Sequence, residues 1–162
     1  MGLKYSLPFP KGVKPVTGAP HGRYAHNGPK FRHATDFVVP PGTPVLAARG
    51  GTIYFVKHDS TTYISDMALM DRMTEKELRR FAEKHTNWVT IDNGDGTFAE
   101  YVHLDTRQIV RPGQKIRRRQ RIGYIGMSGL TTEPHLHFNA VREKRKRKGR
   151  KSFESFPVEF SA

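Results

Sequence analysis

The chain contains no cysteine, and this absence removes several kinds of chemistry at once. A disulfide framework, a zinc site built from thiolates and a cysteine nucleophile are all excluded. A zinc ion would therefore have to be bound by histidine and carboxylate side chains, its other usual ligands. At 162 residues, of which 36% are hydrophobic, the chain is still long enough to form one domain over residues 1–162 around its own core.

Long apolar stretches are also missing. No segment approaches the roughly 20 consecutive apolar residues of a membrane-spanning helix, so we expect no transmembrane segment. Residues 1–8 lack the apolar centre of a secretory signal peptide. We therefore expect either the mature part of an exported protein or export by another route.

Acidic residues are scarce: 15 Asp and Glu stand against 28 Lys and Arg, which gives a formal net charge of +13. The basic residues concentrate in residues 115–121 and in a basic tail segment, residues 142–151. Such clusters favour a polyanionic partner, namely nucleic acid, an anionic membrane or an acidic wall polymer. For 115–121 we favour a solvated strand and turn, because Ile116 and Ile122 supply an apolar pattern, whereas for Arg142–Lys151 we expect a partner. The sequence has no recognised nucleic-acid-binding module, so we expect no specific nucleic-acid partner.

Most of the chain consists of short runs rich in β-branched and aromatic residues, separated by Gly, Pro and Asn. This pattern predicts a mainly β fold, a small antiparallel β-sheet domain. Residues 93–96 (Asn-Gly-Asp-Gly) predict a hairpin turn between strands over 88–92 and 98–104, because these residues tolerate positive φ. Residues 135–141 predict a later strand.

Residues 57–87 interrupt the strand pattern and predict one short helical insertion. Thr74 and Glu77 have the spacing of a capping box, in which each side chain bonds the backbone of the other residue. Leu78 and Phe81 then share one helical face. We expect the methionine-rich residues 67–73 to pack beneath that helix. The insertion is larger than a plain hairpin, so we expect it to form part of one wall of a groove.

Residues 134–138 (Pro-His-Leu-His-Phe) contain a His-x-His pair. Alternate side chains of a strand point to the same face, so His135 and His137 project together while Leu136 and Phe138 turn into the core. Two imidazoles on one rigid face are half of a metal site, or a ligand paired with a proton-transfer group. Taken alone, the pair fits surface histidines of an amphipathic strand equally well.

Other histidines occur with useful neighbours. His26 and His33 precede Asp36, which begins a strand, and His103 ends the second strand of the predicted hairpin. A hydrolytic zinc site takes three protein ligands and leaves one position for water. One histidine of the first loop, Asp36 and one histidine of the His-x-His pair would supply that set. The remaining two histidines would then be available for proton transfer and oxyanion stabilisation.

Five groups of motifs occur in a fixed order along the chain. They are Tyr24–His26 before Ala34–Phe37, Pro41–Val45 with Ala47–Gly51, Gly94–Thr97 with Tyr101–Leu104, Val110–Ile116 with Ile122–Gly123, and Gly126–Gly129 before Pro134–Phe138. In content and order they resemble the lysostaphin-type, LytM-like zinc endopeptidases, a family of peptidoglycan hydrolases. The resemblance runs from about residue 7 to residue 160. It implies a small antiparallel β domain with a zinc groove.

Carried over residue by residue, the resemblance implies that Asp36 and His137 bind Zn²⁺ and that His103 and His135 are unligated catalytic histidines beside the metal. Many members place the third ligand four residues before the aspartate, a position that Arg32 occupies here. Tyr24–Gly28 is similar to a branch of the family that places this histidine further upstream. The resemblance therefore implies His26 as the third ligand.

His33 is the alternative ligand, but it is one residue out of register with the usual position and would face the other side of an extended segment. Glu133 is a second departure, because the family usually has glycine just before the Pro-His pair. An extra carboxylate there would line the substrate groove, or would be a solvated turn residue.

The resemblance implies an extracytoplasmic monomer that cuts stem or cross-bridge peptides of peptidoglycan. The segment from Arg142 to Lys151 would hold the enzyme against an anionic wall polymer. The alternative is a catalytically silent wall-binding or hydrolase-activating module of the same fold. Because the chain keeps a full set of candidate ligands, the sequence favours the enzyme.

Overall fold

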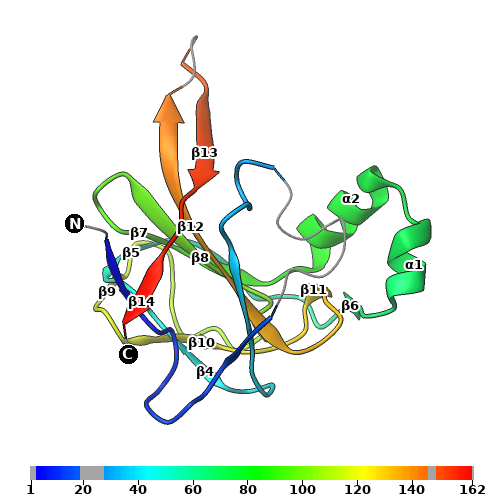
Figure 1. Cartoon of the computed structure of the whole chain (residues 1–162), viewed down its shortest axis with the longest axis horizontal. Helices are drawn as coiled ribbons and strands as arrows, with labels where there is room; N and C mark the ends of the chain where they lie inside the picture. Colours follow the sequence, from blue (N-terminus) through cyan, green and yellow to red (C-terminus); the bar gives the residue numbers. More distant parts are fainter. Residues whose placement is uncertain (1–2, 19–27, 146–148, 162) are drawn as a thin grey trace.

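The computed structural model describes residues 3–18, 28–145 and 149–161, and most of their secondary structure is β (Figure 1). Two helices are present in the described ranges, α1 (Met67–Arg72) and α2 (Glu75–His85). The strands are β1 (Lys4–Ser6), β2 (Val16–Gly18), β3 (Thr35–Val38), β4 (Pro44–Leu46), β5 (Gly51–Lys57), β6 (Tyr63–Ile64), β7 (Trp88–Asp92), β8 (Thr97–Val102), β9 (Lys115–Ile116), β10 (Arg121–Tyr124), β11 (Gly129–Leu130), β12 (His135–Arg145), β13 (Lys151–Ser155) and β14 (Glu159–Ser161).

The main sheet has the strand order β2-β3-β12-β8-β7-β5-β9, and β13 pairs with the far end of β12. Each pairing within this sheet is antiparallel. Three two-stranded sheets complete the fold: β4 with β10 antiparallel, and β1 with β14 and β6 with β11 parallel. The predicted mainly β, antiparallel fold is confirmed.

The hydrophobic core lies on one face of the main sheet, against β1, β14 and the β4–β10 pair. Leu136 and Phe138 of β12 are buried, as the period of a strand predicts. The Phe138 ring meets the rings of Tyr5 and Tyr101 edge to face, at centroid distances of 5.9 and 5.3 Å. The Tyr101 hydroxyl accepts a 2.8 Å hydrogen bond from the Ala48 backbone, so its polar end is satisfied inside the core. These contacts fix β12 and β8, the strands that carry the histidines.

The hairpin between β7 and β8 forms where the sequence predicts it. Gly94 and Gly96 have φ of 80° and 81°, values that favour glycine. The Asp92 carboxylate accepts a 2.8 Å bond from the Gly94 N–H and closes the start of the turn. The strand and turn predicted for residues 115–121 are also present: Ile116 and Ile122 are buried, and the residues between them are exposed or half-buried.

The insertion contains two helices, where the sequence analysis predicted one. The capping box of α2 is present: Thr74 Oγ1 accepts from the Glu77 N–H at 3.2 Å, and a Glu77 carboxylate oxygen accepts from the Thr74 N–H at 2.8 Å. The methionine-rich residues form α1, whose first turn is capped by the Asp66 carboxylate. Met70 and Leu78 are buried, one from each helix. Neither of these helices of the described ranges has the length and apolar content to cross a membrane.

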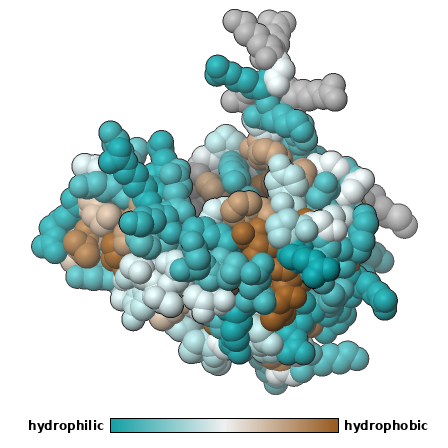
Figure 2. All heavy atoms as spheres, turned by 180° about the vertical axis from the view of Figure 1, so that it is seen from behind, coloured by the Kyte–Doolittle hydropathy of each residue, from teal (hydrophilic) through white to brown (hydrophobic). Residues whose placement is uncertain are grey.

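The basic segment 142–151 is not a tail where it is described, because both of its ends belong to the paired strands β12 and β13. The two strands form an arm that projects from the body (Figure 1) and is hydrophilic toward its tip (Figure 2). Lys144 pairs with Glu154, and Lys151 pairs with Glu143 at 3.3 Å. The arm therefore carries carboxylates as well as cationic side chains.

Candidate active site

Three neighbouring strands of the main sheet bring the predicted site residues together. β3 and β8 flank the first half of β12, and His137 lies directly across from Asp36 on one side and Val102 on the other. The His137 Nδ1 atom is 2.9 Å from Asp36 Oδ1. Asp36 is 9% exposed, so its carboxylate is largely out of bulk water. The side chains of two predicted zinc ligands, a buried carboxylate and a half-buried imidazole, thus lie side by side.

His135 projects to the same face of β12, two residues earlier. Its Nε2 atom is 3.9 Å from Asp36 Oδ1. Its Nδ1 atom is 2.8 Å from the Glu133 carbonyl oxygen and 3.0 Å from the Thr131 hydroxyl. Because a carbonyl oxygen can only accept, Nδ1 carries the hydrogen and Nε2 is the basic nitrogen. Burial lowers the pKa of the His135 imidazole, although the Glu133 carbonyl opposes the shift.

His103 directly follows the last residue of β8, the strand that flanks β12 on the side opposite β3. Its ring centroid is 4.6 Å from that of His135 and 6.2 Å from that of His137. Its Nδ1 atom is 2.7 Å from the Ser128 carbonyl oxygen, so this imidazole also carries its hydrogen on Nδ1. Burial, and after it the nearby His135 ring, lower the pKa of His103 to about 3. His103 is therefore a neutral imidazole at pH 7, in the form that accepts a proton.

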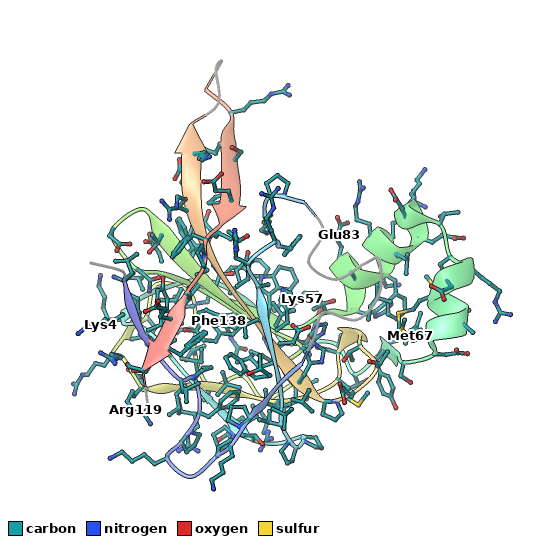
Figure 3. The ribbon with its side chains drawn as sticks, viewed as in Figure 1. Lys4, Lys57, Met67, Glu83, Arg119 and Phe138 are labelled. Atoms are coloured by element: carbon teal, nitrogen blue, oxygen red, sulfur yellow. The ribbon has the colours of Figure 1, made fainter. Side chains whose placement is uncertain are left out.

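A groove of about 750 Å³ runs along this face of the sheet and contains Asp36 and all three of these histidines in its lining. Met67, Met70 and Leu78 line it from the helices, which confirms that the insertion forms one wall. In Figure 3, Met67 lies on α1 and Glu83, another lining residue, lies on α2. Glu133 also lines the groove, as one of the two sequence interpretations proposed.

Of the two candidates for the third zinc ligand, His26 and His33, the structure describes only His33. His26 lies outside the described residues. His33 is exposed in the turn before β3, and its backbone N–H donates to Ser155 Oγ at 3.0 Å. His33 is not among the residues that line the groove. Within residues 3–18, 28–145 and 149–161, no three His, Asp or Glu side chains converge as a complete metal-binding group.

Sequence reasoning missed the groups that hold the imidazoles in place. The acceptors for His103 and His135 are the backbone carbonyls of Ser128 and Glu133. Because every residue has a backbone carbonyl, the sequence does not show which carbonyl will accept a bond from a histidine. The motif Gly126–Gly129 marked the region that contains Ser128, but its role follows from the fold.

Residues 30–148 match the model of peptidase family M23. The peptidoglycan DD-endopeptidase ShyA of Vibrio cholerae serotype O1 is 31% identical over 134 residues, which are 82% of this chain and 23% of that protein. The chain thus spans about a quarter of the length of this relative.

Two solved structures share the fold. A zinc-containing peptidase from Vibrio cholerae is 21% identical, with a TM-score of 0.56 over 92% of this chain and 38% of that chain. The catalytic domain of lysostaphin from Staphylococcus simulans is 23% identical, with a TM-score of 0.50 over 91% of this chain and 84% of that chain. The likeness to lysostaphin confirms the fold that the sequence resemblance implied.

Proposed function

The chain belongs to peptidase family M23, and from this premise we propose that it is a zinc-dependent endopeptidase that hydrolyses peptide cross-links of bacterial peptidoglycan. One observation carries the proposal: the buried Asp36 carboxylate lies 2.9 Å from the half-buried His137 imidazole, beside two neutral imidazoles in one groove. Relatives named peptidoglycan DD-endopeptidases support the substrate class.

The donor atoms at Asp36 and His137 suit zinc. Carboxylate oxygen and imidazole nitrogen are the zinc ligands available to a chain without cysteine. The two donors come from paired strands, so the sheet fixes their spacing before any ion binds. Asp36 and His137 would hold the ion, with His26 as the third ligand. When bound, zinc supplies Lewis-acid polarisation of water and of a peptide carbonyl.

The protein's own residues provide the proton chemistry. His103 and His135 each donate Nδ1–H to a carbonyl oxygen, which leaves Nε2 of each ring to accept a proton. One imidazole takes a proton from the attacking water at Nε2, stabilises the developing oxyanion while it is protonated, and then passes the proton to the leaving amine. Burial lowers the pKa of both imidazoles, so each ring is neutral at rest with Nε2 in the form that accepts a proton.

The groove and the arm suit a polymeric substrate. An extended stem or cross-bridge peptide would lie between the helical wall and the sheet, with its scissile bond at Asp36 and His137. The basic segment Arg142–Lys151 would bind an anionic wall polymer and raise the local enzyme concentration. We therefore propose that the protein acts outside the cytoplasm, in the periplasm, the cell wall or the medium.

Zinc analysis and mass spectrometry of digests test the proposal. The purified chain, supplied with zinc, should release cross-linked fragments from peptidoglycans, and the masses will identify the bond that is cut. His103→Ala should keep zinc and lose most of this release. A wild-type chain that binds zinc and peptidoglycan but releases nothing would instead support the catalytically silent wall-binding or hydrolase-activating module.

A further inference from the structure

Asn87, the second residue after α2, is fully buried, and its side-chain amide joins the two ends of the helical insertion. Its Nδ2 donates to the Ser60 carbonyl at 2.7 Å, and its Oδ1 accepts from the Ser60 N–H at 3.1 Å. The same Nδ2 lies 3.2 Å from the Leu104 carbonyl oxygen. The amide therefore satisfies groups from the start of the insertion and from the segment that follows His103.

The backbone of Asn87 extends this network toward the loop before β11. Its N–H donates to Ser128 Oγ at 2.9 Å, and that hydroxyl donates to the Leu104 carbonyl at 2.8 Å. The Leu104 N–H in turn donates to the Asn87 carbonyl at 3.2 Å. These bonds form a closed ring among Asn87, Leu104 and Ser128, inside which every partner is buried.

His103 lies directly beside this ring, in a backbone conformation that needs support. Its φ is 68°, in the left-handed region that a residue with a Cβ rarely adopts. Leu104 follows it and is held by Asn87, while Gly126 N–H donates to the His103 carbonyl at 2.9 Å. Ser128 also supplies the carbonyl oxygen that bonds His103 Nδ1 and so fixes the orientation of the imidazole. Strained backbone of this kind persists where the surrounding structure over-determines it.

The close approach of the two segments depends on glycine. Gly129 has φ of 87°, and a Cβ added there would lie 2.2 Å from the Thr86 hydroxyl oxygen. The loop before β11 can therefore reach Asn87 because residue 129 has no side chain.

We propose that Asn87 and Ser128 are positioning residues, which hold His103 in its left-handed backbone and in the Nδ1–H tautomer, so that Nε2 is presented to the substrate. Because the amide of Asn87 also bonds Ser60, the same network ties the helical wall of the groove to this histidine. The inference rests on the proposed function for its kinetic consequence, but the tautomer of His103 can be observed independently.

The test compares Asn87→Ala and Ser128→Ala with the control Asn93→Ala in the full chain. Asn93 also donates from Nδ2 to a backbone carbonyl, Gly50 at 3.1 Å, but it lies in the β7–β8 turn away from His103. The readouts are zinc content, kcat and KM on a cross-linked peptide, and the ring ¹⁵N shifts of His103, assigned by their loss in His103→Gln. Ser128→Ala keeps the backbone carbonyl and removes one side-chain oxygen, so it provides a folded variant if Asn87→Ala does not fold.

Loss of an outer partner of this kind costs about 10–100-fold in activity. We expect kcat to fall by that factor in Asn87→Ala and Ser128→Ala, with KM within about twofold and zinc unchanged, while the His103 ring loses its preference for Nδ1–H. Asn93→Ala should leave kcat and the tautomer as in the wild type. An unchanged tautomer in Ser128→Ala, or an equal loss of kcat in Asn93→Ala, would overturn the inference. If the wild type cleaves nothing, the proposed function fails and the ¹⁵N shifts alone decide the positioning role.

Discussion

The two halves of strand β12 differ in how the fold uses them. The first half, His135–Phe138, is paired with β3 along its whole length and holds its histidines among buried partners. The second half, from Val141 to Arg145, pairs with β13 and carries ion pairs whose side chains are open to solvent, such as Lys144 at 56% exposure. One continuous strand thus supports a rigid site at one end and a charged arm at the other.

Because one half of β12 is buried and the other is exposed, substitutions in the two halves should differ in their effect on stability and function. A buried polar group that loses its partner pays the full cost of desolvation, because water cannot replace the missing bond. An exposed ion pair is screened by water and salt, so its loss changes stability little. Substitutions in the first half should therefore change metal binding, catalysis and folding, whereas substitutions in the arm should change binding to a charged partner.

The largest expected effect is at the predicted ligands. Asp36→Ala and His137→Ala should each lose the zinc that the wild type binds at about one per chain, and turnover should fall to background, because each removes one of the three protein ligands of a hydrolytic zinc site. Metal analysis after gel filtration, together with a cleavage assay, checks this. Full zinc content in both variants would remove the ligand assignment.

The second prediction concerns the third ligand. His26→Ala should lose zinc and activity, whereas His33→Ala, at an exposed turn outside the groove, should keep zinc and most turnover. Isothermal titration with zinc compares the two variants directly. The reverse result would assign the ligand to His33.

The third prediction separates catalysis from metal binding. His103→Ala and His135→Ala should keep zinc and lose about 10²–10⁴-fold in rate, the usual contribution of a general acid or base. The double variant should lose less than the product of the two factors, since both rings serve one proton transfer. If His135→Ala loses zinc while His137→Ala keeps it, the two members of the pair are assigned in reverse.

The fourth prediction concerns folding. Leu136 is fully buried between the two histidines of β12, and Leu136→Ala should lower the free energy of unfolding by about 2–5 kcal/mol because it leaves a cavity in the core. Urea unfolding followed by circular dichroism measures the loss. A change below about 1 kcal/mol, the size expected of an exposed ion pair, would show that the two halves of β12 do not differ as described.

The smallest effect on stability should come from the arm. Replacing Lys144, Arg150 and Lys151 together by Ala should change the free energy of unfolding by about 1 kcal/mol or less. Cleavage of a soluble peptide should be unchanged, and binding to a wall teichoic acid should weaken and lose part of its salt dependence. The matched control replaces Lys115, Arg117 and Arg121, the same number of cations, and should keep polymer binding. Equal losses in both triple variants would indicate attraction by net charge alone.

Local patterns made much of the fold and site predictable. The period of a strand placed Leu136 and Phe138 in the core and the two histidines outside it, and the Thr74–Glu77 spacing gave a capping box that the structure contains. In each case the interacting groups lie within a few residues of one another, so the sequence contains the whole signal.

The features that the sequence did not predict depend on contacts between distant residues. Asn87 and Ser128 are 41 positions apart, and their bond exists because α2 ends beside the loop before β11. Asp66 caps α1, but a carboxylate before a methionine-rich run is too common a pattern to identify a second helix. The pairing of β12 with β13 was also missed, because the density of charge in 142–151 obscured the alternation of the strand.

The parallel pairing of β1 with β14 places Lys4 opposite Glu159, so the first and last described strands lie side by side, on the flank away from α1 and α2 (Figure 1). Adjacent ends of this kind permit circular permutation, in which a short linker joins them and new ends are opened elsewhere. The exposed turn at Gly94 and Asp95 is a suitable place for the opening. A permuted chain would keep every strand pairing around the groove and would present its new ends at a hairpin, where a reporter or a surface anchor can be attached.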